Sequence, residues 1–122
     1  NVTTLTRDSF DAYLEKKREK KRPCLVMFHV SWCKVCVRTL PKFMAASDQV
    51  IGKSIGLDFA HVDCTDDKSL CQRYNVKGYP TIKFFQPAAK EPMTYRSPRS
   101  EEGFIKYAER MTLEPVRAFK GV

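Results

Sequence analysis

Two cysteines separated by two residues, Cys33 and Cys36, are the side chains whose spacing most clearly supports chemistry in this 122-residue chain. They follow Trp32, the single tryptophan of the sequence. Two thiols at this spacing meet within the first turn of a helix, where one attacks a disulfide and the other resolves the mixed disulfide. A pair of this kind also binds metal ions or simply packs, so the elements around it must decide between these interpretations.

The neighbouring elements predict which thiol attacks. Residues 24–30 form a nearly continuous apolar run, which is typical of a strand buried on both faces. A helix is predicted from Cys36 to about Ser47, so Cys33 lies between the strand and the helix. Unpaired backbone N–H groups and the positive end of the helix dipole favour a thiolate there. We therefore predict that Cys33 is the nucleophile and Cys36 the resolving thiol.

The remaining elements alternate between strands and helices. Strands are predicted over 2–5, 57–63, 81–85 and 93–95, and helices over about 8–20, over 68–74 and after Ser100. Pro41 removes one backbone hydrogen bond from the second helix and should kink it. Asn75 suits a left-handed residue after the third helix. The order βαβαβαββα predicts an α/β fold, with a central mixed sheet flanked by helices on both faces.

The composition describes one folded domain. A hydrophobic fraction of 43% excludes a disordered chain, and no apolar run approaches the length of a membrane span. We interpret residues 1–122 as a single monomeric domain excised from a longer protein. The formal charge is +8, and a basic run covers residues 15–22. Because no aromatic residues interleave with this run, we predict the solvated end of a helix, no nucleic-acid partner and no membrane insertion.

Five cysteines are many for a cytosolic chain of this length, and four of them could form two local pairs. Asn1-Val2-Thr3 is also a glycosylation acceptor pattern. Both observations favour an oxidising, secretory compartment. Cys24, at the entrance of a strand, is most simply a small buried hydrophobic residue.

A zinc site is the alternative chemistry for these cysteines. Cys33, Cys36, Cys64 and Cys71 can be written as a four-thiolate set, but six residues separate the last two. Structural zinc sites favour two to four residues between paired ligands, so we expect no metal.

The sequence resembles the thioredoxin superfamily, and more closely the catalytic domains of protein disulfide isomerases. The motifs that carry the resemblance are Trp32-Cys33 with Cys36, Pro41, Gly78-Tyr79-Pro80-Thr81, and Tyr95 followed by Pro98-Arg99-Ser100. The resemblance implies a thioredoxin fold and a thiol–disulfide oxidoreductase that acts on cysteine-containing polypeptides and redox partners. It implies no organic cofactor.

The same resemblance implies roles for four further residues. Pro80 would follow a cis peptide bond and face the dithiol. The backbone of Tyr79 would pair with an extended substrate segment, next to Trp32. Arg99 matches a family arginine that lowers the pKa of the resolving thiol, although a surface arginine beside a helix cap is the alternative.

Several residues depart from the family pattern. Lys34 and Val35 stand where disulfide isomerases usually have glycine and histidine, so we expect a less acidic thiol and a more reducing potential. Met27 stands where the family usually buries a carboxylate that relays the proton of the resolving thiol, and His61 replaces the neighbouring lysine. His61, or His29 on the same strand face as Met27, is a candidate replacement for this relay. The alternative is that both are packed core histidines.

Cys64 and Cys71 match a cysteine pair that several relatives carry. The resemblance implies a structural disulfide, and a redox switch is the alternative interpretation. The pair supports a location in the endoplasmic reticulum lumen or the secretory pathway. Two other functions remain open. One is a cytoplasmic thioredoxin-like reductase, for which a free Cys64–Cys71 dithiol would speak. The other is a chaperone-like module that binds clients with little turnover.

Overall fold

The computed structural model describes residues 2–112, and Asn1 of the glycosylation pattern lies outside them. The elements in chain order are β1 (Thr3–Leu5), α1 (Phe10–Glu19), β2 (Cys24–His29), α2 (Lys34–Gly52), β3 (Asp58–Asp63), α3 (Lys68–Arg73), β4 (Thr81–Phe85), β5 (Met93–Thr94) and α4 (Glu101–Thr112). This order confirms the predicted succession βαβαβαββα.

The strands form one mixed sheet in the order β1-β3-β2-β4-β5. β3 pairs in parallel with both β1 and β2, whereas β4 pairs antiparallel with β2 and β5. The central strand β2 is buried along its whole length, because it has a neighbouring strand on each side and a layer of helices on each face. The predicted α/β fold with a mixed sheet is therefore confirmed.

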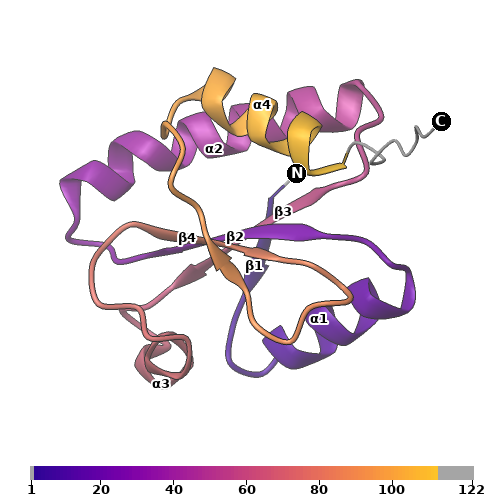
Figure 1. Ribbon diagram of the computed structural model, residues 1–122. Coiled ribbons are helices and arrows are strands. Elements are labelled where there is room, and N and C mark those ends of the chain that lie inside the picture. Colours follow the sequence, from indigo (N-terminus) through magenta and orange to yellow (C-terminus); the bar gives the residue numbers. More distant parts are fainter. Residues whose placement is uncertain (1, 113–122) are drawn as a thin grey trace, which may run out of the picture.

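Helices cover both faces of the sheet (Figure 1). Alternate residues of β2 point to opposite faces, so Val26 and Phe28 pack with α1 and α3, whereas Leu25 and Met27 pack with α2 and α4. Each face of the sheet therefore has its own apolar core, formed with the helices that cover it. The dithiol lies between the end of β2 and the first turn of α2.

The second helix is longer than the sequence pattern predicted. α2 passes Ser47 and continues to Gly52, because Phe43, Ala46 and Val50 recur at helical spacing and are fully buried. Pro41 lies inside this helix, where it has no N–H to donate to the preceding turn. One continuous face of the helix therefore packs into the core between the sheet, α2 and α4. The two cysteines lie at the first turn of this helix.

A tight approach between backbone segments positions the chain around Arg99. The N–H of Gly103 donates to Ser100 Oγ at 3.0 Å, which confirms the predicted cap of α4. Any Cβ on Gly103 would collide with the carbonyl oxygen of Pro98, so only glycine allows this contact. Tyr95 Oη donates to the same carbonyl. The segment that carries Arg99 is thus held between β5 and α4.

The end of the sheet away from the dithiol is held by an ion-pair cluster. Asp58 accepts hydrogen bonds from Lys17 Nζ at 2.7 Å and from Arg22 Nε at 2.8 Å. Burial alone would raise the pKa of Asp58, but the hydrogen bonds from Arg22 and Lys17 outweigh it and hold this pKa below its usual value. Two residues of the basic run 15–22 therefore have a structural role, because Lys17 and Arg22 join the α1 region to β3 through Asp58.

Candidate functional site

The dithiol lies at the first turn of α2. Cys33 is the N-cap residue, and its sulfur accepts a hydrogen bond from the backbone N–H of Cys36 at 3.1 Å. A residue in this position receives the N–H groups that the helix leaves unpaired, together with the positive end of its dipole. Both thiols are free and buried, and Cys33 is the more exposed of the two, at 9% against 2%.

The environment of Cys36 holds its proton. Burial raises the pKa of the Cys36 thiol to about 11, and the hydrogen bond and charge of Cys33 add to this effect. A backbone hydrogen bond from Val30 and the charge of Arg99 act in the opposite direction. Cys33 is thus the more exposed thiol at the helix N-terminus, as an attacking thiol requires. Cys36 is the more buried thiol with a raised pKa, as a resolving thiol requires.

A ledge formed by Tyr79 and Pro80 faces Cys33. The peptide bond between these two residues is cis, as the resemblance implied, and the Cys33 thiol lies 3.7 Å from the carbonyl oxygen of Tyr79. The Trp32 ring meets the Tyr79 ring edge-on at 6.1 Å and is 73% exposed. Arg99 Nη1 donates to the carbonyl oxygen of Pro80 at 3.4 Å. The structure thus brings the predicted substrate-binding residues and Arg99 to the dithiol.

Two cavities flank this ledge. The first, the Trp32 cleft, has a volume of about 410 Å³ and is lined by Val30, Trp32, Cys64, Thr65, Lys68, Cys71, Gln72, Val76 and Tyr79. The second, the Arg99 cavity, has a volume of about 310 Å³ and is lined by Pro80, Thr81, Ile82, Thr94, Tyr95, Arg96, Ser97 and Arg99.

Cys64 and Cys71 are joined by a disulfide, with their Cα atoms 5.9 Å apart. The bridge links the residue after β3 to α3 and lies in the wall of the Trp32 cleft. Both cysteines are almost fully buried, at 1% and 2% exposure. This pair is therefore oxidised while Cys33 and Cys36 are free thiols, which fits the structural interpretation better than a free second dithiol.

The two histidines form a hydrogen-bonded pair. His29 Nε2 and His61 Nδ1 are 2.8 Å apart, and His61 Nε2 lies 3.0 Å from Thr4 Oγ1. Burial lowers the pKa of both imidazoles, His29 lowers that of His61 further, and Asp63 opposes the shift in both. Neutral rings satisfy this arrangement, since one nitrogen of the pair must donate and the other accept.

The hydrogen bonds of His61 run to His29 and Thr4. Within residues 2–112, the groups found to act on the Cys36 thiol are Cys33, Val30 and Arg99, whereas His61 is engaged by His29 and Thr4. A direct bond between His61 and the dithiol is not among these interactions, so a catalytic role for His61 stays a prediction. The sequence placed His29 and Met27 on one strand face but could not reveal the bond between the two imidazoles.

Met27 is fully buried in the core between the sheet and helices α2 and α4. It lies in register with His61 on β3 and with Ile82 on β4. Met27 offers no proton acceptor, and it belongs to a different core cluster from Cys33 and Cys36.

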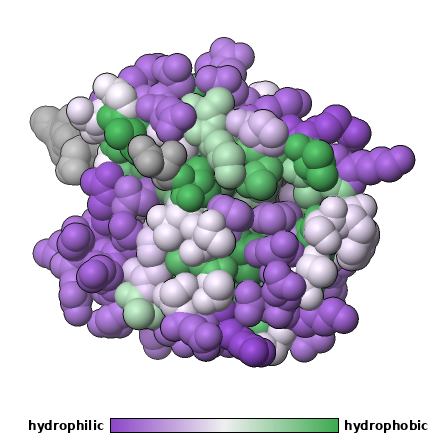
Figure 2. Space-filling model, turned by 180° about the vertical axis from the view of Figure 1, so that it is seen from behind, coloured by the Kyte–Doolittle hydropathy of each residue, from purple (hydrophilic) through white to green (hydrophobic). Residues whose placement is uncertain are grey.

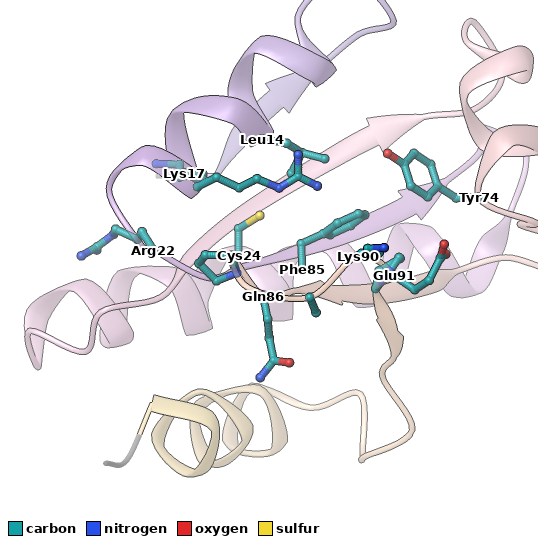
Figure 3. A pocket seen from close by; sticks show the side chains of 13 residues that line it. Leu14, Lys17, Arg22, Cys24, Tyr74, Phe85, Gln86, Lys90 and Glu91 are labelled. Carbon is teal, nitrogen blue, oxygen red and sulfur yellow. The ribbon is translucent and has the colours of Figure 1, made fainter. Parts of the chain in front are cut away.

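Cys24 takes no part in the site. It is fully buried at the start of β2 beside a cavity of about 40 Å³, where Lys17, Arg22 and Phe85 are its neighbours in the lining (Figure 3). Burial raises the pKa of this thiol to about 12. Cys24 therefore remains protonated and packs as the sequence predicted.

Exposed apolar side chains extend from the dithiol along α2. Trp32, Val35 and Val37 lie around the cysteines, and Met44 and Ile51 continue at seven-residue spacing from Val37. Figure 2 shows hydrophobic residues gathered across the upper part of the molecule, where α2 and α4 lie. Such a surface is suited to binding another polypeptide.

No helix within residues 2–112 combines the length and the apolar character that a membrane crossing requires.

The basic run 15–22 belongs to α1 and the turn after it, where Arg18 also pairs with Glu15.

The family model for thioredoxin matches residues 1–110. The chain is 35% identical over 107 residues to a probable protein disulfide-isomerase ER-60 of Schistosoma mansoni, covering 87% of this chain and 21% of that protein. It is also 35% identical over 109 residues to protein disulfide isomerase-like 2-1 of Oryza sativa subsp. japonica, covering 88% of this chain and 28% of that one.

Among solved structures, the zinc-bound form of human ERp44 is similar, with a TM-score of 0.82 and 30% identity over 94% of this chain and 32% of that chain. The chain therefore spans about a fifth to a third of each of these proteins. Because the family model covers nearly the whole chain, and the fold and the dithiol both agree with it, this protein belongs to the thioredoxin family.

Proposed function

We propose that this domain is a thiol–disulfide oxidoreductase of the protein disulfide isomerase type. The observation that carries the proposal is the position of Cys33 at the N-cap of α2, where its sulfur accepts the N–H of Cys36 opposite the Tyr79–Pro80 ledge. This geometry stabilises negative charge on the Cys33 sulfur, while the raised pKa of Cys36 keeps the second thiol protonated until it is needed.

The exchange proceeds in two steps. The Cys33 thiolate attacks one sulfur of a substrate disulfide, the substrate S–S bond breaks, and the departing sulfur leaves as a thiolate that takes up a proton. Cys36 then loses its proton and attacks the Cys33 sulfur, which releases the second substrate thiol. Two electrons pass from the domain to the substrate, and Cys33 and Cys36 end as a disulfide; the reverse sequence oxidises a substrate dithiol.

Two side chains assist these steps. The charge of Arg99 favours the Cys36 thiolate in the second step, since it acts against the burial of this thiol. The exposed Trp32 ring and the cis Tyr79–Pro80 ledge receive the substrate segment beside Cys33. The substrates are cysteine-containing polypeptides, and the binding energy comes from backbone and apolar contacts.

The proposed location is the endoplasmic reticulum lumen or another secretory compartment. A buried disulfide between Cys64 and Cys71 supports an oxidising environment, and the relatives named as protein disulfide isomerases point the same way. A cytoplasmic reductase is less well supported, because a free Cys64–Cys71 dithiol was expected for it and these two cysteines form a disulfide.

An insulin-reduction assay tests the proposal. The reduced domain should accelerate the precipitation of insulin chains with dithiothreitol as the electron source, and Cys33→Ser should abolish the acceleration. Cys24→Ser is the matched control, since this buried thiol should leave the rate unchanged. Equal activity of the wild type and Cys33→Ser would contradict the proposal.

Client binding with little turnover is the second candidate. The exposed Trp32, Val35 and Val37 favour it, as does the buried Met27, which stands where the family resemblance implies a proton-relaying carboxylate. A domain that suppresses aggregation of an unfolded client equally well with Cys33→Ser, and fails to reduce insulin, would support this function over the first.

A further inference from the structure

Five basic side chains frame the dithiol and its two cavities: Lys34, Lys68, Lys77, Arg96 and Arg99. Lys34 begins α2 directly after Cys33, and Lys77 precedes Gly78 at the approach to the ledge. Lys68 lines the Trp32 cleft, whereas Arg96 and Arg99 line the Arg99 cavity. Positive charge therefore borders the site on both sides of Pro80.

In the part of the chain that the structure describes, these five cations have no carboxylate partner. Within residues 2–112 none of them lies within 4.0 Å of a carboxylate oxygen. Away from the dithiol, by contrast, Asp58 pairs with two cations and Arg73 pairs with Asp11 at 2.7 Å. The positive charge at the site is thus left available to a partner.

The carboxylates nearest in sequence form no ion pair with these five cations within residues 2–112. In the loop before α3, Asp63 accepts the N–H of Thr65 at 2.9 Å, and the buried Asp67 accepts the N–H of Arg7 at 3.3 Å. Asp66 is exposed in the same loop.

At the start of α4, Glu102 pairs with Lys106 at 3.3 Å, and Glu101 is exposed. Asp66 and Glu101 are the exposed acids of these two segments that form no ion pair within residues 2–112, against five exposed cations.

The geometry of the ledge relates this charge to the substrate. A substrate cysteine that reaches the Cys33 sulfur lies beside the Tyr79 carbonyl, so its chain neighbours lie over the two flanking cavities. An extended chain advances about 3.3–3.6 Å per residue, so the residues next to the cysteine on either side stay close to this frame.

We propose that this site selects cysteine-containing segments with acidic residues close to the cysteine on both sides. The inference rests on the proposed function and adds a class of substrate to it. Carboxylates of the segment would meet Lys68 beside the Trp32 cleft and Arg96 beside the Arg99 cavity. Complementary charge of this kind acts mainly on the association rate and on the choice of partner.

Three synthetic peptides with one internal disulfide test the proposal. They share one sequence except that the two positions on each side of the attacked cysteine carry Glu, Gln or Lys. The bimolecular rate constant for reduction by the reduced full chain is measured at about 0.01 M and about 1 M ionic strength, where the Debye length is about 30 Å and about 3 Å. We expect the Glu peptide to react about 10-fold faster than the Lys peptide at low salt. At high salt the two rates should differ by less than about twofold.

A pair of double variants separates the local charge from the net charge. Lys68→Glu with Arg96→Glu should reverse the preference, with each rate expressed relative to the Gln peptide on the same variant. Lys16→Glu with Lys20→Glu changes the net charge equally and, at about 0.1 M ionic strength, where the Debye length is about 10 Å, should retain the preference. These two exposed lysines lie at the α1 end of β2, and the dithiol follows the other end, a strand length of about 20 Å away.

The outcomes distinguish this inference from the proposed function. Equal reduction of all three peptides at low salt would overturn the charge selection and leave the oxidoreductase intact. Equal loss of the preference for the Glu peptide in both double variants would also overturn the charge selection. The net charge of the domain would then be sufficient to explain the preference. If none of the peptides is reduced, including the Gln peptide, the proposed function itself fails.

Discussion

The backbone N–H of Cys36 donates to the sulfur of Cys33 at 3.1 Å, so the two cysteines are electrostatically unequal within one helical turn. The hydrogen bond and the helix dipole favour charge on Cys33, whereas burial raises the pKa of Cys36 to about 11. The order of attack in the proposed exchange follows from this inequality.

Alkylation should report the inequality directly. Iodoacetamide should modify Cys36 more slowly than Cys33 at every pH below about 11, because the thiolate is the reactive species and burial keeps Cys36 protonated. Cys24, with a pKa of about 12, serves as the internal control that stays unmodified in the folded protein. Peptide mapping after timed labelling measures each site, and faster labelling of Cys36 than of Cys33 would contradict the assignment.

Met27→Glu should increase turnover and lower stability together. A carboxylate at position 27 restores the proton acceptor that the family resemblance implies. We expect turnover to rise by up to about 10²-fold, the lower end of the usual contribution of a positioned proton acceptor. The same substitution buries a carboxylate in place of a fully buried apolar side chain, so the urea midpoint should fall.

Met27→Gln is the matched control for this substitution, since it is polar but cannot accept the proton as a carboxylate does. Equal turnover of both variants and the wild type would mean that another group or solvent already takes the proton. In that case His61→Ala tests the relay through the histidine pair, and unchanged turnover in that variant would exclude His61.

Removal of the Cys64–Cys71 disulfide should destabilise the domain without removing the dithiol. The bridge closes a loop with a sequence separation of 7, and the loss of such a constraint on the unfolded chain costs about 2–3 kcal/mol. Urea unfolding of the Cys64→Ser, Cys71→Ser double variant measures this change, with the Cys24→Ser variant as a control for loss of a buried sulfur. An unchanged free energy of unfolding would argue against a structural role.

The histidine pair predicts a fall in stability at mildly acidic pH. Because folding lowers the pKa of His29 and His61 below the ordinary value of 6.5, the unfolded chain binds more protons in acid. The contribution of the neutral histidines to the free energy of unfolding is complete above about pH 6.5. It is lost as the pH falls from there through the lower pKa values that His29 and His61 have in the folded protein.

The sequence contains two histidines, so the change between pH 5 and pH 7 should belong to this pair. Urea midpoints at several pH values measure it, and the His29→Gln, His61→Gln variant should flatten the curve in this interval. The same slope in wild type and variant would assign the effect to other groups.

The elements around the dithiol were predictable because their signals are local. The apolar run of β2, the cysteines one helical turn apart and the Gly78-Tyr79-Pro80 segment each depend on a few consecutive residues. The left-handed backbone of Asn75, with φ of 58°, is local in the same way.

The remaining features depend on contacts between distant segments. The bond between His29 and His61 requires the parallel register of β2 with β3, in which Met27 lies opposite His61. The length of α2 beyond Ser47 depends on burial of Val50 against the sheet and α4. Neither pairing is encoded in the local pattern, so composition and periodicity alone did not reveal them.

Mixed-disulfide trapping tests the central claim most directly. The Cys36→Ser variant should accumulate a covalent complex with a reducible client such as insulin, since Cys33 still attacks and no second thiol resolves the product. The Cys33→Ser variant should accumulate none. Non-reducing gels with mass spectrometry of the joined peptides measure both complexes. Equal trapping by the two variants, or a complex joined through Cys36, would contradict the assignment of Cys33 as the nucleophile.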